Sequence, residues 1–250
     1  MKASRIDISK TGEIKIKLHR PIEGEVKTCT IKKRGSHWYV ALVAVQQLSV
    51  KKEPGDRAVG IDLGLWSFAV LSDGGVIDNP RYLKKSGEKL KGIQRIYSKR
   101  KGKARKRKLV SLHRKVANQR NDFLHKTSRM LVNQYGLIVY EDLDIKQMMM
   151  EGRHAKGIAD VSWSKFIKIL KYKAASAGSY AIAVKPQYTT QACSGCGRLE
   201  KKAIWERQHN CPECGLSIHR DLNASKNILR SAIGLLEERA MPANQQSHLL

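Results

Sequence analysis

The chain has 250 residues, enough to bury one main hydrophobic core with smaller attachments. Its formal net charge of +26 at pH 7 far exceeds what solubility requires, and it favours binding to a polyanion, with nucleic acid first and an anionic membrane surface second. We find no apolar run of about 18 residues and no signal peptide, which predicts a soluble protein of the cytoplasm rather than a membrane-spanning or secreted one.

The N-terminal part of the sequence predicts antiparallel β-structure. Between Ile14 and Val45, apolar and polar residues alternate, with breaks at 21–24 and at Gly35, which is typical of strands in a small barrel or sheet. Cys29 lies in this stretch, and we expect it to be a small buried hydrophobic residue. Residues 49–56 are charged and contain Pro and Gly, so they predict a linker.

A β-meander and two basic helices are expected next. Residues 57–78 predict three short strands joined by glycine turns, with Asp62 at the end of the first strand. Residues 84–129 contain 18 Lys and Arg but only Glu88 and Asp122 as acids, a net charge of +16. Apolar residues recur at helical spacing in this span, so it predicts two basic helices with one apolar face.

The second half of the chain alternates between strand and helix patterns. Residues 136–142 form a short apolar run that predicts a buried strand ending near Glu141. Residues 144–160 show no firm periodicity and predict a mobile loop. An amphipathic helix over 163–178, a strand over 179–186, a closing helix over 221–236 and a disordered last dozen residues complete the expectation.

Three carboxylates stand where this pattern would bring acids together. Asp62 and Glu141 lie at the ends of predicted strands, and Asp221 opens the closing helix. Carboxylate oxygens suit magnesium, and two such ions about 3.5–4 Å apart can promote hydrolysis of a phosphodiester. Taken singly, Asp62 could shape a turn, Glu141 could pair with a lysine and Asp221 could cap a helix, and these alternatives stay open.

Four cysteines form a second candidate metal site. The pairs Cys193/Cys196 and Cys211/Cys214 each have C-x2-C spacing, with fourteen residues between the pairs and a glycine after each. This spacing is typical of a zinc ribbon with four thiolate ligands, and rubredoxin-like iron is the alternative. Four thiolates leave no open position, so the site would be structural. Trp205 in the intervening hairpin could stack on bases, but we expect it to pack against the ribbon.

The most basic segment has no acids to balance it. Between 100 and 108 the sequence reads RKGKARKRK, whose self-repulsion would be offset by a polyanion, with nuclear targeting as a weaker interpretation. We expect the following side chains of this segment and the helix after it to bind nucleic acid: Arg100, Lys101, Lys103, Arg105, Lys106, Arg107, Lys108, Arg114 and Lys115.

Taken together, these motifs resemble the transposon-encoded TnpB family, which is related to the type V CRISPR effector nucleases. The resemblance covers residues 5–236 and depends on GIDLGLWSFAVLSDG, IVYEDLDIKQMM, WSKFIKILKYKAASAG, TTQACSGCG, CPECG and RDLNASKNIL. It implies an α/β fold with an RNase H-like (RuvC) mixed sheet flanked by helices. It also implies that Asp62, Glu141 and Asp221 are catalytic magnesium or manganese ligands, and that the four cysteines hold zinc.

The resemblance also implies a domain organisation. Residues 1–50 would be part of an oligonucleotide-binding (wedge) barrel, and 57–186 a RuvC-like nuclease domain with its basic helical region at 82–134. A zinc ribbon at 187–218, a final RuvC segment at 219–237 and a disordered tail at 238–250 would follow. We expect the chain to lack the family's N-terminal recognition region, and His219 stands where the family commonly has an acid.

The functional expectation is an RNA-guided DNA endonuclease that acts by two-metal hydrolysis and is associated with transposition. DNA would be the substrate, guide RNA the partner and the nucleoid the location. Two other functions stay open: a catalytically inactive DNA-binding transposon protein or regulator, and a transposase that performs strand transfer. Binding that weakens with salt, without metal-dependent cleavage, would distinguish the inactive protein.

Overall fold

We describe the chain from a computed structural model. It describes residues 3–240 except 10, 20, 36, 47–55, 153 and 204. The chain divides into two compact units, residues 1–49 and 50–250, and each is considered by itself. The predicted linker lies almost entirely in 47–55, outside the described residues.

The first unit consists of two antiparallel hairpins. Strand β1 (Ala3–Ile8) pairs with β2 (Gly12–Lys17), and β3 (Glu25–Arg34) pairs with β4 (His37–Val45). Within the described residues of this unit, the two hairpins form separate sheets, so the barrel stays a prediction. Every residue of β3 is exposed, and the expectation that Cys29 is buried is therefore wrong. An alternating pattern buries side chains only where a second layer covers the hairpin.

The second unit is built on a five-stranded mixed sheet with the strand order β7-β6-β5-β8-β9. The predicted meander is confirmed as β5 (Ala58–Leu63), β6 (Ser67–Leu71) and β7 (Val76–Asp78), which pair antiparallel. Strands β8 (Leu137–Glu141) and β9 (Tyr180–Val184) were also predicted, and they extend the sheet in parallel from β5. Parallel pairing requires crossover connections, which the intervening helices provide.

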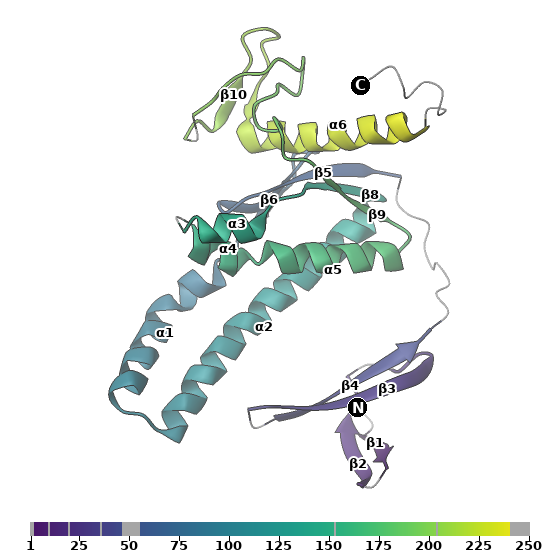
Figure 1. The fold of residues 1–250 in the computed structure, drawn as a ribbon, viewed down its shortest axis with the longest axis vertical. Helices are drawn as coiled ribbons and strands as arrows, with labels where there is room; N and C mark the ends of the chain where they lie inside the picture. Colours follow the sequence, from purple (N-terminus) through teal and green to yellow (C-terminus); the bar gives the residue numbers. More distant parts are fainter. Residues whose placement is uncertain are drawn as a thin grey trace. The chain divides into compact units, whose positions relative to one another are not determined.

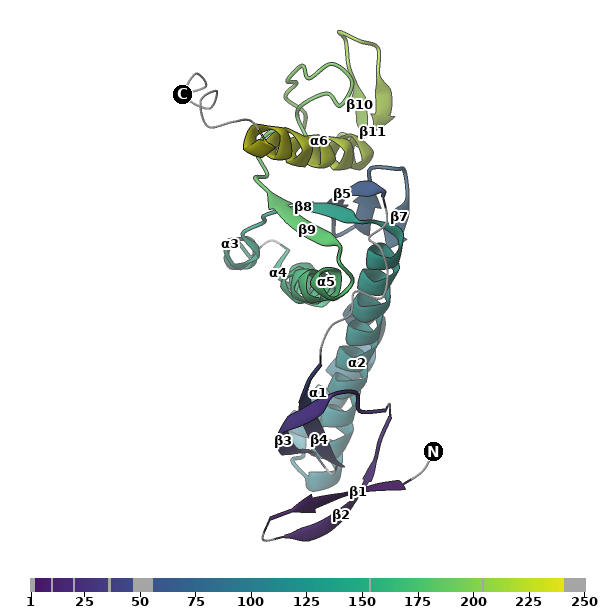
Figure 2. The ribbon, with the colours of Figure 1, turned by 90° about the vertical axis from the view of Figure 1, so that its right-hand side faces the viewer.

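Helices cover both faces of this sheet (Figures 1 and 2). On one face lies α6 (Arg220–Ala240), whose Ile228 and Ala232 pack on Val139 and Val184. On the other face, α2 (Lys103–Gln134) and α5 (Trp163–Ser176) bury the larger core around Phe68, with Phe123 and Phe166 edge-on to its ring. The result is a three-layer α/β arrangement, the fold class that the sequence predicts.

The basic span forms the expected helical hairpin. Helix α1 (Tyr82–Lys99) and α2 lie against each other, and the sharp connection at 100–102 joins them (Figure 1). Asp160 receives the backbone N–H of Leu83 at 3.0 Å and the guanidinium of Arg120 at 2.8 Å. This carboxylate supplies the N-terminal turn of α1 with the acid that its own sequence lacks.

The expected mobile loop at 144–160 is instead mostly helical. Helices α3 (Ile145–Met150) and α4 (Ala155–Val161) occupy most of it, and Ile158 and Val161 are buried. The side chain of Asp144 accepts a hydrogen bond from the backbone N–H of Gln147 at 2.9 Å and caps α3. Two short helices separated by Gly152 have no extended apolar period, so the loop prediction was wrong.

The remaining helices end close to where the sequence predicts. Gly178 adopts a φ of 74°, the left-handed conformation that ends α5. Helix α6 continues to Ala240, beyond the expected end of the final segment at 237, and most of the expected tail, 241–250, lies outside the described residues. Among the described helices, none is both long and apolar enough to cross a bilayer.

Candidate active site

Asp62 lies at the C-terminal end of the central strand β5. Strand alternation places Gly60 and Asp62 on the face covered by α6, opposite Val59 and Ile61, which enter the main core. The carboxylate is largely enclosed by protein, although the residue keeps some exposure to solvent. The central strand therefore presents one acid beneath the closing helix.

Glu141 ends the neighbouring parallel strand. Ile61 and Tyr140 are paired across β5 and β8, so the residues that follow them, Asp62 and Glu141, end adjacent strands. Glu141 is only 7% exposed, and its Oε1 accepts a hydrogen bond from the Thr189 hydroxyl at 2.5 Å. Thr189 has no signal in the sequence that predicts this role, apart from its place in the motif TTQACSGCG.

Asp221 reaches the same region from the first turn of α6. A Cβ atom added to Gly60 would lie 2.1 Å from the backbone oxygen of Ser225, so α6 crosses β5 at backbone contact. Asp221 is one helical turn before Ser225, and its charge contributes to raising the pKa of Asp62, so the two carboxylates lie near the same end of this crossing. The side chain of Asp221 is 21% exposed.

Gly60→Ala should therefore separate the two acids. The added methyl group meets backbone atoms of Ser225 and Leu229 that cannot rotate away, so α6 must shift. We expect a loss of about 1–3 kcal/mol in the free energy of unfolding, the usual cost of overpacking, measured by urea denaturation. Gly92→Ala in α1 is the control, because its Cβ meets nothing within 4 Å, and unchanged stability in Gly60→Ala would contradict the crossing.

The pKa of Asp62 reflects both its burial and the charges of the two other acids. Burial, foremost, and then the charges of Glu141 and Asp221 raise the pKa of Asp62 to about 8, although Arg220 and Arg207 oppose the shift. Burial also raises the pKa of Glu141, against the hydrogen bond from Thr189. A bound cation would offset the free-energy cost of ionising these carboxyl groups, because it stabilises their charged forms.

The three acids offer the oxygen ligands that magnesium prefers, but their carboxylates are not closely clustered. Within the described part of the chain, the three acids do not place one carboxylate oxygen each within 4.8 Å of one another, as the four cysteines do with their sulfurs. Sites for two ions about 3.5–4 Å apart tolerate wider spacing, since each acid need reach only one ion and water fills the other positions. The structure thus brings the predicted acids into one region without fixing an ion's position.

Two cationic or polar groups flank Asp221. Arg207 Nη1 lies 3.8 Å from Asp221 Oδ1, and His219 Nδ1 lies 3.9 Å from Oδ2. The backbone N–H of Asp221 donates to His219 Nδ1 at 3.3 Å, so that nitrogen acts as an acceptor. His219 consequently lies beside the third acid, where its other ring nitrogen can face water or substrate.

The four cysteines form a compact cluster beside this region. All four sulfurs lie within 4.8 Å of one another, with Cys193–Cys214 at 3.7 Å and Cys196–Cys211 at 3.6 Å. Tetrahedral zinc with Zn–S bonds of about 2.3 Å requires sulfurs about 3.8 Å apart, so the cluster fits a zinc ribbon. Gly197 and Gly215 have φ of 84° and 73°, as the two turns of such a ribbon need.

Polar side chains of α6 hold this ribbon to the central sheet. Asn223 accepts from the backbone N–H of Ser194 at 2.8 Å and donates to the oxygen of Ala192 at 2.7 Å. Asn227 donates to the backbone oxygens of Thr189 and Ala192 at 2.9 and 2.7 Å. Both asparagines are buried, so one helix positions Asp221, the ribbon and the residue that contacts Glu141.

The aromatic residue of the ribbon is exposed rather than packed. Trp205 is 82% exposed, so the expectation that it packs against the ribbon is wrong. The strands of the ribbon, β10 (Gln208–Asn210) and β11 (Ser217–His219), have three residues each and bury little beyond His209. A hairpin this short has no apolar face large enough to cover an indole ring.

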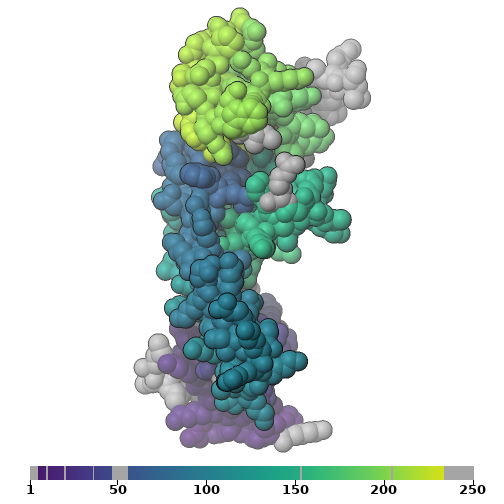
Figure 3. Space-filling view, turned by 90° about the vertical axis from the view of Figure 1, so that its left-hand side faces the viewer, coloured from purple at the N-terminus to yellow at the C-terminus, as the bar shows by residue number. Residues whose placement is uncertain are grey.

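The predicted nucleic-acid-binding residues gather at the free end of the helical hairpin. Arg100 and Lys101 lie in the connection, and the others lie on the first turns of α2. All except the half-buried Arg114 are exposed. In Figure 3, α1 forms a blue column on one face of the second unit, and the ribbon lies at the other end of that unit. The tip of the hairpin thus carries exposed positive charge at a distance from the sheet.

Comparison with known proteins places the chain in a family. Residues 39–151 match a family described as "Probable transposase", and residues 163–228 match the "Cas12f1-like, TNB domain". "TnpB-like protein L770" of Acanthamoeba polyphaga mimivirus is 28% identical over 86% of this chain and 45% of its own length. The chain belongs to the TnpB family.

Two bacterial relatives of this TnpB-family chain carry more specific names. "Putative RNA-guided DNA endonuclease InsQ" of Escherichia coli (strain K12) is 29% identical over 97% of the chain and 67% of its own length. A "Putative RNA-guided DNA endonuclease" of Streptomyces pristinaespiralis is 32% identical over 92% of the chain and 59% of its own length. The chain therefore spans only about three fifths to two thirds of these relatives.

Solved structures share the fold of this TnpB-family chain. A Cas12f1 complex with single guide RNA and target DNA superposes with a TM-score of 0.51 at 19% identity, covering 81% of this chain and 55% of the other. A CRISPR-Cas12f ternary complex gives a TM-score of 0.50 at 20% identity, covering 80% and 44%. At this level of identity the likeness supports the mixed-sheet architecture alone.

Proposed function

We propose that this chain is the nuclease part of an RNA-guided DNA endonuclease of the TnpB type, a metal-dependent enzyme that hydrolyses phosphodiester bonds. The observation that supports the proposal is geometric: Asp62 and Glu141 lie at the ends of the paired strands β5 and β8, and α6, which carries Asp221 in its first turn, crosses β5 at Gly60. Names of relatives add support, since two of them are called RNA-guided DNA endonucleases.

In this proposal the three acids hold magnesium or manganese. When bound, the ions would activate a water molecule and stabilise the leaving oxygen of the phosphodiester. Thr189 holds Glu141 in place through its hydroxyl, and Asn227 fixes Thr189 from α6. Arg207 and Arg220 lie close enough to lower the pKa of Asp62, and their charges also attract the phosphate of a strand.

The helical hairpin would bind the nucleic acid. Its tip carries exposed lysines and arginines, and the span 84–129 has a net charge of +16. Each Lys or Arg that neutralises a phosphate releases a counterion, so binding should weaken steeply with salt. Guide RNA and DNA are the polyanions proposed here, by analogy with the complexes of the structural neighbours.

Metal-dependent cleavage is the test of this function. Purified chain incubated with labelled single-stranded DNA is expected to produce fragments with Mg²⁺ or Mn²⁺ and none with EDTA. Binding without any fragments, with or without a guide RNA from the same locus, would instead favour the inactive DNA-binding protein. Joined products in place of shortened ones would favour strand transfer.

A further inference from the structure

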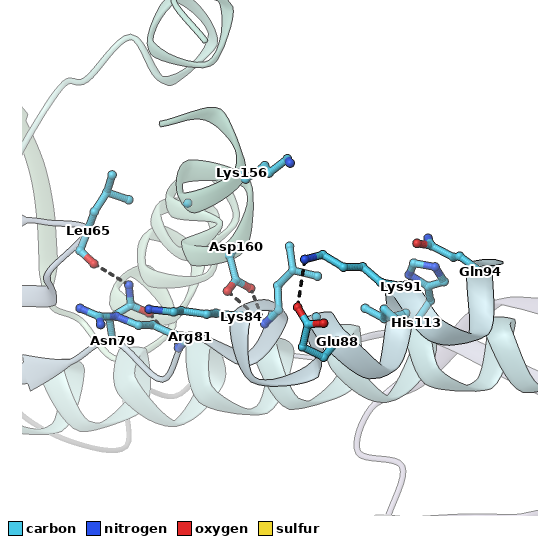
Figure 4. A pocket seen from close by; sticks show the side chains of 14 residues that line it. Leu65, Asn79, Arg81, Lys84, Glu88, Lys91, Gln94, His113, Lys156 and Asp160 are labelled. Atoms are coloured by element: carbon cyan, nitrogen blue, oxygen red, sulfur yellow. Dashed lines mark hydrogen bonds and ion pairs between the residues drawn. The ribbon is translucent and has the colours of Figure 1, made fainter. Parts of the chain in front are cut away.

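A pocket on the hairpin side of the sheet has no role in the proposed chemistry. It lies between α1, α2, α4 and the β5–β6 turn, and its volume is about 600 Å³ (Figure 4). Pockets that enclose small organic ligands have volumes of about 300–1,000 Å³, so this one is large enough for a single nucleotide. Its opening faces solvent beside the basic helices.

The lining of the pocket combines an apolar surface with surplus positive charge. Leu65, Leu83 and the buried Leu90 provide apolar area, while Arg81, Lys84, Lys91 and Lys156 provide cations. Figure 4 shows Lys156 on α4 above the opening and Lys84 and Lys91 on α1 below it. A nucleotide matches this lining, because its flat base suits the apolar surface and its anionic phosphate suits the cations.

The two acids of the lining are already neutralised. Asp160 receives Arg120 at 2.8 Å, and Glu88 receives Lys91 at 2.9 Å. Within the described part of the chain, neither Lys84 nor Lys156 forms an ion pair. These two ammonium groups, on opposite helices, are therefore available for a phosphate.

An aromatic residue, Trp66, adjoins the lining through its contact with Arg81. Trp66 is 74% exposed, and the guanidinium of Arg81 lies 5.2 Å from the centre of its ring. Arg81 also donates to the backbone oxygen of Trp66 at 3.1 Å, while Asn79 donates to that of Leu65 at 2.8 Å. These bonds hold the stacked pair in place before any ligand arrives, which lowers the entropy lost on binding.

We propose that this pocket binds one unpaired nucleotide of the nucleic acid that the hairpin holds. The base would lie on the leucines and the Trp66 ring, and Lys84 and Lys156 would contact its phosphate. Gln94 and His113 line the pocket as well and offer polar groups to the edge of the base. The inference rests on the proposed nucleic-acid function, and it adds a preference for single strands over duplex.

Two glycines of α1 allow a matched test. Gly87 lines the pocket and Gly92 does not, and a Cβ atom at either position meets nothing within 4 Å. Gly87→Phe should fill the pocket, and we expect binding of a 2-aminopurine-labelled single strand to weaken by about 10-fold or more in EDTA. Gly92→Phe, which alters the same helix in the same way, should bind like the wild type.

Binding of duplex DNA and the variant Lys156→Ala provide two further tests of the pocket. Binding of the corresponding duplex should change by less than about 2-fold in Gly87→Phe, because paired bases cannot enter the pocket. Lys156→Ala, at an exposed position, should weaken single-strand binding without affecting the thermal unfolding midpoint. Equal losses for duplex and single strand, or no loss in Gly87→Phe, would overturn the pocket assignment. A chain that binds as expected but never cleaves would refute the nuclease and leave this inference standing.

Discussion

Asp62→Asn is expected to abolish DNA cleavage while leaving the metal-free protein at least as stable as the wild type. Burial, foremost, and then the charges of Glu141 and Asp221 raise the pKa of Asp62 to about 8, so its ionised form costs folding free energy. Asparagine keeps the shape, removes that charge and removes a metal ligand. We expect a loss in cleavage rate of about 10⁴-fold, the order seen when one member of a catalytic set is removed.

The sign of the stability change follows from the direction of the pKa shift. A carboxyl whose pKa is raised by folding destabilises the protein above its unfolded pKa, and the penalty grows until the pH passes the folded value. The stability gain of Asp62→Asn in EDTA should therefore be absent near pH 3, increase from about pH 4 to pH 8, and then level off. Thermal unfolding at several pH values measures it.

An aspartate on the edge strand of the same sheet provides the control. Asp78 ends β7 and is exposed, so Asp78→Asn makes the same chemical change away from the proposed site. It should cleave like the wild type and unfold at the same temperature. Cleavage by Asp62→Asn at more than about a tenth of the wild-type rate would eliminate Asp62 as a catalytic ligand.

Cys193→Ser is expected to release the zinc that the four cysteines would hold and, with it, most of the proposed cleavage activity. A structural zinc contributes on the order of 10 kcal/mol to folding such a module, and the two three-residue strands of the ribbon cannot replace it. Loss of order would reach Thr189 through Asn227 and free Glu141 from its hydrogen bond. We expect cleavage to fall by about 10–100-fold, as when outer contacts of a metal site are lost.

The fifth cysteine supplies a matched control. Cys29 is exposed on β3 in the other unit, so Cys29→Ser should keep one zinc per chain and full activity. Metal content, hydrogen exchange of the ribbon amides and cleavage should all change together in Cys193→Ser. Full activity in a zinc-free Cys193→Ser protein would show that the ribbon and the acids are independent.

Local sequence patterns were enough to predict most of the second unit. The meander, the basic hairpin, β8, α5 and β9 each carry a period or a turn residue that depends only on neighbouring positions. Asp62 and Glu141 could be selected because they stand at the ends of such strands, and Asp221 because it opens the closing helix. The pairing of β5 with β8 brings the ends of the strands of Asp62 and Glu141 side by side, and no local pattern in the sequence predicts that pairing.

The features that the sequence did not predict depend on contacts between distant parts of the chain. The cap of α1 comes from Asp160, far along the chain, and the partner of Glu141 is a threonine in an irregular segment. Helices α3 and α4 are too short for their apolar period to be visible. Whether Cys29 or Trp205 is covered depends on a second layer, and sequence periodicity does not say whether one is present.

The four tryptophans lie in different parts of the protein, so their fluorescence can report on each part separately. Trp163 is 2% exposed in the core, whereas Trp38, Trp66 and Trp205 are 66%, 74% and 82% exposed, in the first unit, against the pocket residue Arg81 and on the ribbon. Their fluorescence should therefore be dominated by red-shifted emission that stacked bases can quench. Variants that keep a single indole would report separately on melting of the core, entry of a strand and loss of metal.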